Sequence, residues 1–160
     1  MAGYRATVEW KRLGAKFIDQ KYQRVHTWTF ENGLTMKAAA SHHIVPESYT
    51  DLSVIDPEEA FTASVASCHM LWFLSLAAGK GFLVNEYLDH SEGILEKNSE
   101  GNLAMTRIII RPVVIFDADR APNETDFIEL HEKAHKKCFI ANSIKSEILI
   151  KPKMKTDPAL

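Results

Sequence analysis

The chain has 160 residues, 46% hydrophobic and 25% charged, which is typical of a single globular domain with its own core and predicts one domain over residues 1–160. Its formal net charge of -2 gives no basic surface field, which argues against nucleic acid or an anionic membrane as a partner. The first residues, MAGYRATVEW, lack the basic flank and apolar block of a secretory signal, so we expect a cytoplasmic protein.

The N-terminal part contains three short segments that alternate between apolar and polar residues and carry β-forming side chains. These segments are 4–10, 25–31 and 34–40, and the sequence ENG at 31–33 is a hairpin-like turn between the last two. The pattern predicts an antiparallel meander. A polar, proline-containing loop over 41–55 follows it.

A helix is predicted over residues 57–78. Asp56 suits the N-cap and Pro57 the first helical position, and Gly79 and Gly81 supply the stop. The segment is apolar nearly all round, so it should be buried on most sides. A membrane span is the alternative, but we expect a central helix wrapped by sheet or by a partner subunit, because polar residues interrupt the run. These are Thr62, Ser64, Ser67, His69 and Ser75.

The second half predicts a hairpin, a helix and a closing strand, over 92–97, 103–117, 124–138 and 144–151. Pro112 indicates a bulge or an edge position in the long strand. Asn123 can cap the second helix, whose apolar residues follow one stripe. The resulting order, β-β-β-α-β-β-α-β, is that of an α+β fold with antiparallel sheets.

Both cysteines fall on the predicted helices. Cys68 lies in the middle of the first helix and Cys138 on the inward stripe at the end of the second. Each could be a small buried hydrophobic residue. However, Ser64, Ser67 and His69 surround Cys68 with polar atoms that an apolar core would have to satisfy, which favours a polar or hydrated pocket there.

A second cluster of chemically active side chains lies in HEKAHKKC, residues 131–138. His131, His135 and Cys138 occupy positions i, i+4 and i+7 of the second predicted helix, so they could present three ligands to zinc, with Cys68 or His69 as a fourth. The alternative is an amphipathic helix whose histidines lie at the solvent boundary. The spacing alone leaves both interpretations open.

Two segments of the chain resemble the signature of the OsmC/Ohr family, the osmotically inducible and organic hydroperoxide resistance proteins. The first is DPEEAFTASVASCHMLWFLSLAAGKGF, residues 56–82, and the second is AHKKCFIANSI, residues 134–144. Their order and separation are similar to those of the family. The chain departs from the family pattern at three positions, with Asp56 in place of asparagine, His69 in place of phenylalanine and Phe139 in place of proline.

The resemblance implies a thiol-dependent peroxidase acting on organic hydroperoxides. By position, Cys68 matches the family's peroxidatic cysteine and Cys138 the resolving cysteine, which together would form a disulfide. Glu58 matches the family glutamate, and Arg24 corresponds to the arginine that contacts the thiolate. The family implies no bound cofactor or metal, and its reducing equivalents are associated with dihydrolipoyl groups.

The substrate pocket is expected to be apolar, with walls from Phe61, His69, Trp72 and Phe139, which would favour an alkyl or acyl hydroperoxide over hydrogen peroxide. The chemistry requires a positive partner to keep a thiol ionised in apolar surroundings, and a guanidinium provides one. A non-catalytic small-molecule-binding protein with two inert cysteines is the alternative function.

The separation of Glu58 and Cys68 carries an expectation about assembly. Ten residues of helix correspond to about 15 Å of rise and about 80° of rotation, so an unbroken helix keeps these side chains apart. Either the helix kinks between them or a second chain supplies the partner. We expect a homodimer with shared sites, and the resemblance implies an intertwined dimer.

Overall fold

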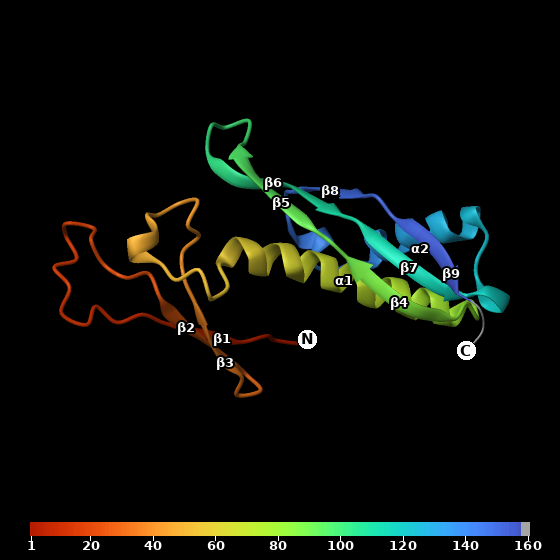
Figure 1. Ribbon diagram of the computed structural model, residues 1–160, viewed down its shortest axis with the longest axis horizontal. Coiled ribbons are helices and arrows are strands. Elements are labelled where there is room, and N and C mark those ends of the chain that lie inside the picture. Colours follow the sequence, from red (N-terminus) through yellow and green to blue (C-terminus); the bar gives the residue numbers. More distant parts are fainter. Residues whose placement is uncertain (158–160) are drawn as a thin grey trace. The chain divides into compact units, whose positions relative to one another are not determined.

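The computed structural model describes residues 1–157. They form two compact units, Met1–Ala60 and the residues from Phe61 onward, and Figure 1 follows both along the chain. The sequence predicts a single domain over residues 1–160. Whether the two units form one domain depends on how they pack together, so this stays a prediction.

The first unit contains the predicted antiparallel meander. Its strands are β1 (Ala6–Glu9), β2 (His26–Phe30) and β3 (Thr35–Ala38), with β2 in the centre and antiparallel pairing on both sides. The predicted turn is confirmed, since the backbone N–H of Gly33 donates to the Phe30 carbonyl. The loop that follows contains one short 3₁₀ helix, Glu47–Tyr49.

The predicted central helix is confirmed as α1, which runs without a break over Pro57–Gly79. Its start is a capping box: Asp56 Oδ1 accepts from the Glu59 backbone N–H at 2.7 Å, and Glu59 Oε2 accepts from the Asp56 N–H at 3.3 Å. Its end is set by Gly81, whose φ of 82° is a conformation that residues with a side chain rarely adopt. The kink considered above is therefore not present.

The burial of α1 differs from the prediction. Only one stripe of the helix is fully buried, formed by Val65, His69, Phe73 and Ala77 at intervals of four residues. Leu71 on another face is 61% exposed. The expectation of a helix buried on most sides is therefore wrong for a single chain, because an apolar residue type does not say which partner covers it.

By length and composition, α1 could also cross a membrane. The core helix of a soluble protein passes the same test, so this property does not identify a membrane span. The polar residues that interrupt the apolar run remain the argument against one.

The second unit is built on three long strands, each broken near its middle. The first comprises β4 (Val84–Asp89) and β5 (Glu92–Lys97), the central one β6 (Leu103–Ile110) and β7 (Pro112–Asp117), and the third β8 (Glu147–Ile150) and β9 (Lys153–Asp157). β7 pairs with β4 and β9, and β6 pairs with β5 and β8. The breaks align, because the Arg111 N–H bonds to Asp89 Oδ1 and the Lys151 N–H to the Ile110 carbonyl.

Three sequence-based expectations about these strands need correction. The sheets are mixed rather than purely antiparallel, because β8 and β9 run parallel to β6 and β7. Strands β4 and β9 were not predicted. Pro112 lies at neither an edge nor a bulge but at the first residue of β7 in the central strand, a position that requires no amide donor at the break.

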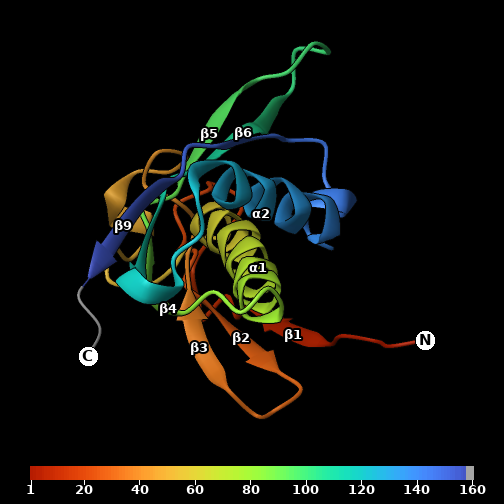
Figure 2. The same cartoon turned by 90° about the vertical axis from the view of Figure 1, so that its right-hand side faces the viewer.

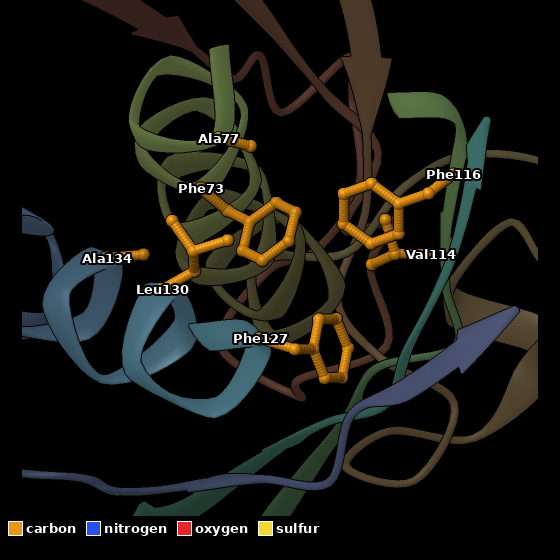
Figure 3. Close-up of a cluster of buried hydrophobic side chains, with 7 residues drawn as sticks. All are labelled: Phe73, Ala77, Val114, Phe116, Phe127, Leu130 and Ala134. Carbon is orange, nitrogen blue, oxygen red and sulfur yellow. The ribbon is translucent and has the colours of Figure 1, made fainter. Parts of the chain in front are cut away.

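The helices of the second unit pack on the same sheet (Figures 1 and 2). The second helix, α2, spans Glu124–Lys137 and is capped by Asn123, whose Oδ1 accepts from the Asp126 N–H at 2.8 Å, as predicted. Short 3₁₀ helices cover Ala118–Arg120 and Ala141–Ser143. Figure 3 shows the main core, in which α1, β7 and α2 meet. Its members are Phe73, Ala77, Val114, Phe116, Phe127, Leu130 and Ala134.

Close packing of β5 against α1 makes a prediction about Gly93. A Cβ at this position would overlap Thr62 Oγ1 and Met105 Cε. Threonine is β-branched and cannot move aside easily within a helix. We expect Gly93→Ala to lower the free energy of unfolding by about 1–3 kcal/mol, measured by urea denaturation. Gly79→Ala is the matched control, because nothing lies within 4 Å of its Cβ position; equal losses in both variants would contradict this packing argument.

Candidate functional site

The two cysteine thiols meet between α1 and the end of α2. Cys68 is half-buried on α1, and Cys138 is only 1% exposed and forms the C-cap of α2. The Cys68 side chain lies close enough to the Cys138 thiol to perturb it, and neither cysteine is in a disulfide. These are the two cysteines that the family motifs in the sequence indicated as a pair, and they lie side by side in the structure.

Burial, followed by the neighbouring Cys68 side chain, raises the pKa of the Cys138 thiol to about 11. Cys138 is therefore protonated near neutral pH. A thiol that stays protonated is a poor nucleophile, which leaves Cys68, half-buried beside Cys138, as the candidate for attack on a substrate.

A cavity of about 550 Å³ lies beside the Cys68 thiol. Its floor is one face of α1, adjacent to the buried stripe of that helix, and Phe139 and Ile140, from the segment after α2, border it on one side. The lining is largely apolar, with small hydroxyl groups between the larger side chains. The lining residues are Ser64, Ser67, Cys68, Leu71, Trp72, Ser75, Phe139 and Ile140.

The structure places the predicted pocket residues in two groups. Trp72 and Phe139 line the cavity, with their rings edge to face at 5.6 Å. Phe61 packs instead in a core cluster with Val65 and the strand β6. His69 is 1% exposed and lies on the buried stripe of α1, so the expectation that it lines this cavity is wrong.

A cation also lies next to the cavity. The Lys137 ammonium sits 5.1 Å from the centre of the Trp72 ring, which is within the range of a cation–π contact. The sequence shows that Lys137 is adjacent to Cys138. It does not show the contact with Trp72, which depends on how α2 packs on α1.

His69 forms a contact that the sequence did not predict. Its Nε2 lies 3.0 Å from His131 Nδ1, and the two rings are nearly parallel, with an interplanar angle of 5°. His131 also stacks on Phe73 at 4.2 Å and meets the edge of Phe127 at 4.7 Å. In the sequence, each histidine lies on the apolar stripe of its own helix, and this position could have indicated that both side chains are buried.

Burial keeps this histidine pair neutral. It lowers the pKa of His69 to about 4, with a smaller effect from His135, and that of His131 to about 3, with a smaller effect from His69. One ring must donate an N–H and the other accept, as two neutral imidazoles can. The outer nitrogens, His69 Nδ1 and His131 Nε2, have no hydrogen-bond partner within residues 1–157.

The zinc interpretation finds no support in this geometry. His131 bonds to His69 rather than converging with His135 and Cys138. Among the residues that the structure describes, no group of three or more histidine, cysteine or acidic side chains could hold a metal ion.

Arg24 lies in the first unit, at the end of a constrained loop. Its Nη1 donates to the carbonyls of Gln20, at 2.8 Å, and of Tyr22, and its guanidinium lies 3.7 Å from the centre of the Tyr22 ring. Leu13, Phe17 and Gln20 in the preceding loop have φ between 48° and 64°. Such conformations persist only where the surroundings impose them, and they cluster at functional sites. The contact between Arg24 and the thiolate stays a prediction.

Glu58 is half-buried in the first turn of α1, ten residues before Cys68. Because α1 is continuous, a rise of about 15 Å along the helix axis separates Glu58 from Cys68. The role of Glu58 in orienting a guanidinium also stays a prediction.

Comparison with known proteins identifies the family and the fold of the chain. The family model described as OsmC-like protein matches residues 51–153. Among solved structures, the chain is similar to an OsmC-like protein of unknown function from Vibrio cholerae, with 42% identity and a TM-score of 0.92 over 95% of this chain and 99% of that one. A comparison with curated proteins finds no match.

More distant structures share the fold. An organic hydroperoxide resistance protein from Elizabethkingia anophelis is 14% identical, with a TM-score of 0.65 over 98% of each chain. Another from Bacillus subtilis is 16% identical, with a TM-score of 0.63 over 96% of this chain and 98% of that one. The predicted α+β fold of the OsmC/Ohr type is thereby confirmed. Because the family model matches more than half of the residues and the Vibrio cholerae relative aligns over nearly all of them, the chain belongs to the OsmC-like protein family.

Proposed function

We propose that this protein is a thiol-dependent peroxidase that reduces organic hydroperoxides through Cys68 and Cys138. The observation that carries the proposal is the close approach of the two cysteine side chains at the edge of a largely apolar cavity. Membership of a family that includes organic hydroperoxide resistance proteins supports the same reaction.

In the first step, the Cys68 thiolate attacks the terminal oxygen of the hydroperoxide. The O–O bond breaks, the sulfur is oxidised by two electrons to a sulfenic acid, and the leaving alkoxide takes up a proton to become an alcohol. The neighbouring Cys138 stays protonated during this step, because its pKa is raised. We assign to Arg24 the positive charge that favours the thiolate and to Glu58 the orientation of the guanidinium.

In the second step, Cys138 condenses with the sulfenic acid. An S–S bond forms, the sulfenic oxygen leaves as water with the Cys138 proton, and both sulfurs end in the disulfide. A dithiol such as a dihydrolipoyl group then reduces this disulfide by exchange and restores both thiols. The raised pKa keeps Cys138 protonated during the first step. To attack the sulfenic sulfur it must give up this proton, which leaves with the sulfenic oxygen as water.

The proposal is tested by turnover with two peroxides. Purified protein with dihydrolipoamide should consume cumene hydroperoxide, and more efficiently than hydrogen peroxide, because the cavity lining favours an apolar group. Saturable binding of cumene hydroperoxide without consumption would instead identify a small-molecule-binding protein. Equal efficiency with both peroxides would contradict the assignment of the cavity to the substrate.

Trp72 offers the sharpest test of the cavity itself. Trp72→Ala removes the largest side chain of the lining and should reduce kcat/KM for cumene hydroperoxide by about tenfold, with little change for hydrogen peroxide. Ile128→Ala is the control, since Ile128 lies on α2 outside the cavity lining and is 40% exposed. A parallel loss for both peroxides would mean that Trp72 acts on the thiol chemistry or the fold rather than on substrate selection.

We also propose that the protein is a cytoplasmic homodimer. Leu71 and Phe139 next to the thiols are 61% and 68% exposed in the single chain, and a second copy would cover them. It would also bring a second Arg24 and Glu58 to the assembly. Light scattering should give twice the 18.1 kDa of one chain; a monomer at micromolar concentration would contradict the shared-site arrangement.

A further inference from the structure

The buried histidine pair links the same two helices that carry the thiols. His69 on α1 bonds to His131 on α2 at 3.0 Å, and both side chains are at most 2% exposed. His69 directly follows Cys68, so the two residues lie at nearly the same height on α1, about 100° apart around its axis. His131 precedes Cys138 by seven residues, which is about two turns, or 10 Å, along α2.

Two polar contacts therefore join α1 to α2 at this height of α1. One is the approach of the two thiols and the other is the hydrogen bond between the imidazoles. Because they are separated by about two turns of α2, the second contact fixes the position and rotation of α2 relative to α1. Apolar packing around the histidines is less directional than a hydrogen bond and would tolerate small shifts.

We propose that His69 and His131 are a positioning pair, which holds α2 against α1 so that the Cys138 thiol stays within bonding reach of Cys68. This proposal rests on the proposed function in one respect, namely that a disulfide between Cys68 and Cys138 forms during the reaction. Neither histidine touches the reacting atoms. A disulfide requires an S–S distance near 2 Å and a restricted dihedral angle, so a displacement of α2 by a fraction of a turn would slow its formation strongly.

The surroundings of the pair keep the hydrogen bond intact near neutral pH. Phe73 stacks on His131 from α1, and Phe127 covers its edge from α2. The strand β7 contributes the apolar Val114 and Phe116 to the same core. The titratable group that acts on the pair from outside is His135 of α2.

The test measures the two steps of cysteine oxidation separately. His131→Leu and the double variant His69→Leu/His131→Leu remove the hydrogen bond, the latter without leaving a single buried imidazole. His131→Asn is the conservative variant, because the asparagine amide carries both an acceptor and a donor and can replace Nδ1 in either role. Phe127→Leu reduces the packing against His131 but keeps both imidazoles and their hydrogen bond, so it controls for a general loss of packing.

In reduced protein treated with one equivalent of cumene hydroperoxide, we expect formation of the Cys68 sulfenic acid to change less than twofold in every variant. Formation of the disulfide should slow about tenfold in the two leucine variants, and stay near the wild-type rate in His131→Asn and Phe127→Leu. The equilibrium constant for the disulfide in a glutathione redox buffer should fall by a similar factor in the leucine variants alone.

A folded double-leucine variant that forms the disulfide at the wild-type rate and equilibrium would overturn the positioning role. The positioning role would also be overturned if Phe127→Leu slowed disulfide formation as much as the leucine variants do. Wild-type protein that forms the disulfide in the redox buffer but does not react with hydroperoxide would overturn the proposed function and leave the positioning role standing.

Discussion

Cys68→Ser is expected to reduce hydroperoxide turnover by about a thousandfold or more, to the background of the uncatalysed reaction. Serine has nearly the same shape but is not ionised near neutral pH, so the attack on the O–O bond loses its nucleophile. The measurement is consumption of cumene hydroperoxide with dihydrolipoamide as the reductant. The loss should appear in kcat/KM without a change in stability, because Cys68 is only half-buried.

Cys138→Ser is the matched control for this experiment. It should still react once with the hydroperoxide, because Cys138 acts after the first step, and the Cys68 sulfenic acid should persist long enough for dimedone to trap it. Steady-state turnover should be low in this variant for lack of the disulfide. If Cys68→Ser kept its turnover and Cys138→Ser lost reactivity altogether, the roles of the two residues would have to be exchanged.

Acid is expected to destabilise the fold through the buried histidine pair. The pKa values of His69 and His131 in the folded protein are about 4 and about 3, against 6.5 for an ordinary histidine. As pH falls below 6.5, the unfolded chain takes up protons that the folded chain does not, so the free energy of unfolding decreases until the pH approaches the folded-state values. Between pH 7 and pH 5 the loss should be about 2–4 kcal/mol for the two histidines together.

The measurement is urea denaturation of wild-type protein and of the double variant His69→Leu/His131→Leu at several pH values. The difference between them isolates the pair from the other titrating groups, which both proteins share. The variant should show a flatter dependence over this range. Parallel curves for the two proteins would show that the histidines titrate at ordinary values and are not buried as described.

Local signals in the sequence predicted much of the fold. Both helices begin at residues whose side chains cap them, Asp56 and Asn123, and α1 ends near Gly81. These signals act within a few residues, so they are readable without tertiary structure. The resemblance of the motifs around the two cysteines to a known family also identified the family correctly, whereas the catalytic roles of Cys68 and Cys138 stay a prediction.

The missed features depend on contacts between distant segments. Strand β9 carries exposed, charged residues, and its pairing with β7 stabilises it rather than its own composition. His69 was assigned to the pocket because it neighbours Cys68, but neighbouring residues on a helix face different directions. Its partner, His131, is 62 residues away, and a hydrogen bond over that separation leaves no local pattern.

The most direct test of the account is the mass of the protein after one equivalent of cumene hydroperoxide. Intact-mass measurement should show the loss of two hydrogens, and peptide mapping under non-reducing conditions should locate the change in a link between the Cys68 and Cys138 peptides. An unchanged mass would contradict the central claim. So would a disulfide that joins two chains in place of the link between Cys68 and Cys138 within one chain.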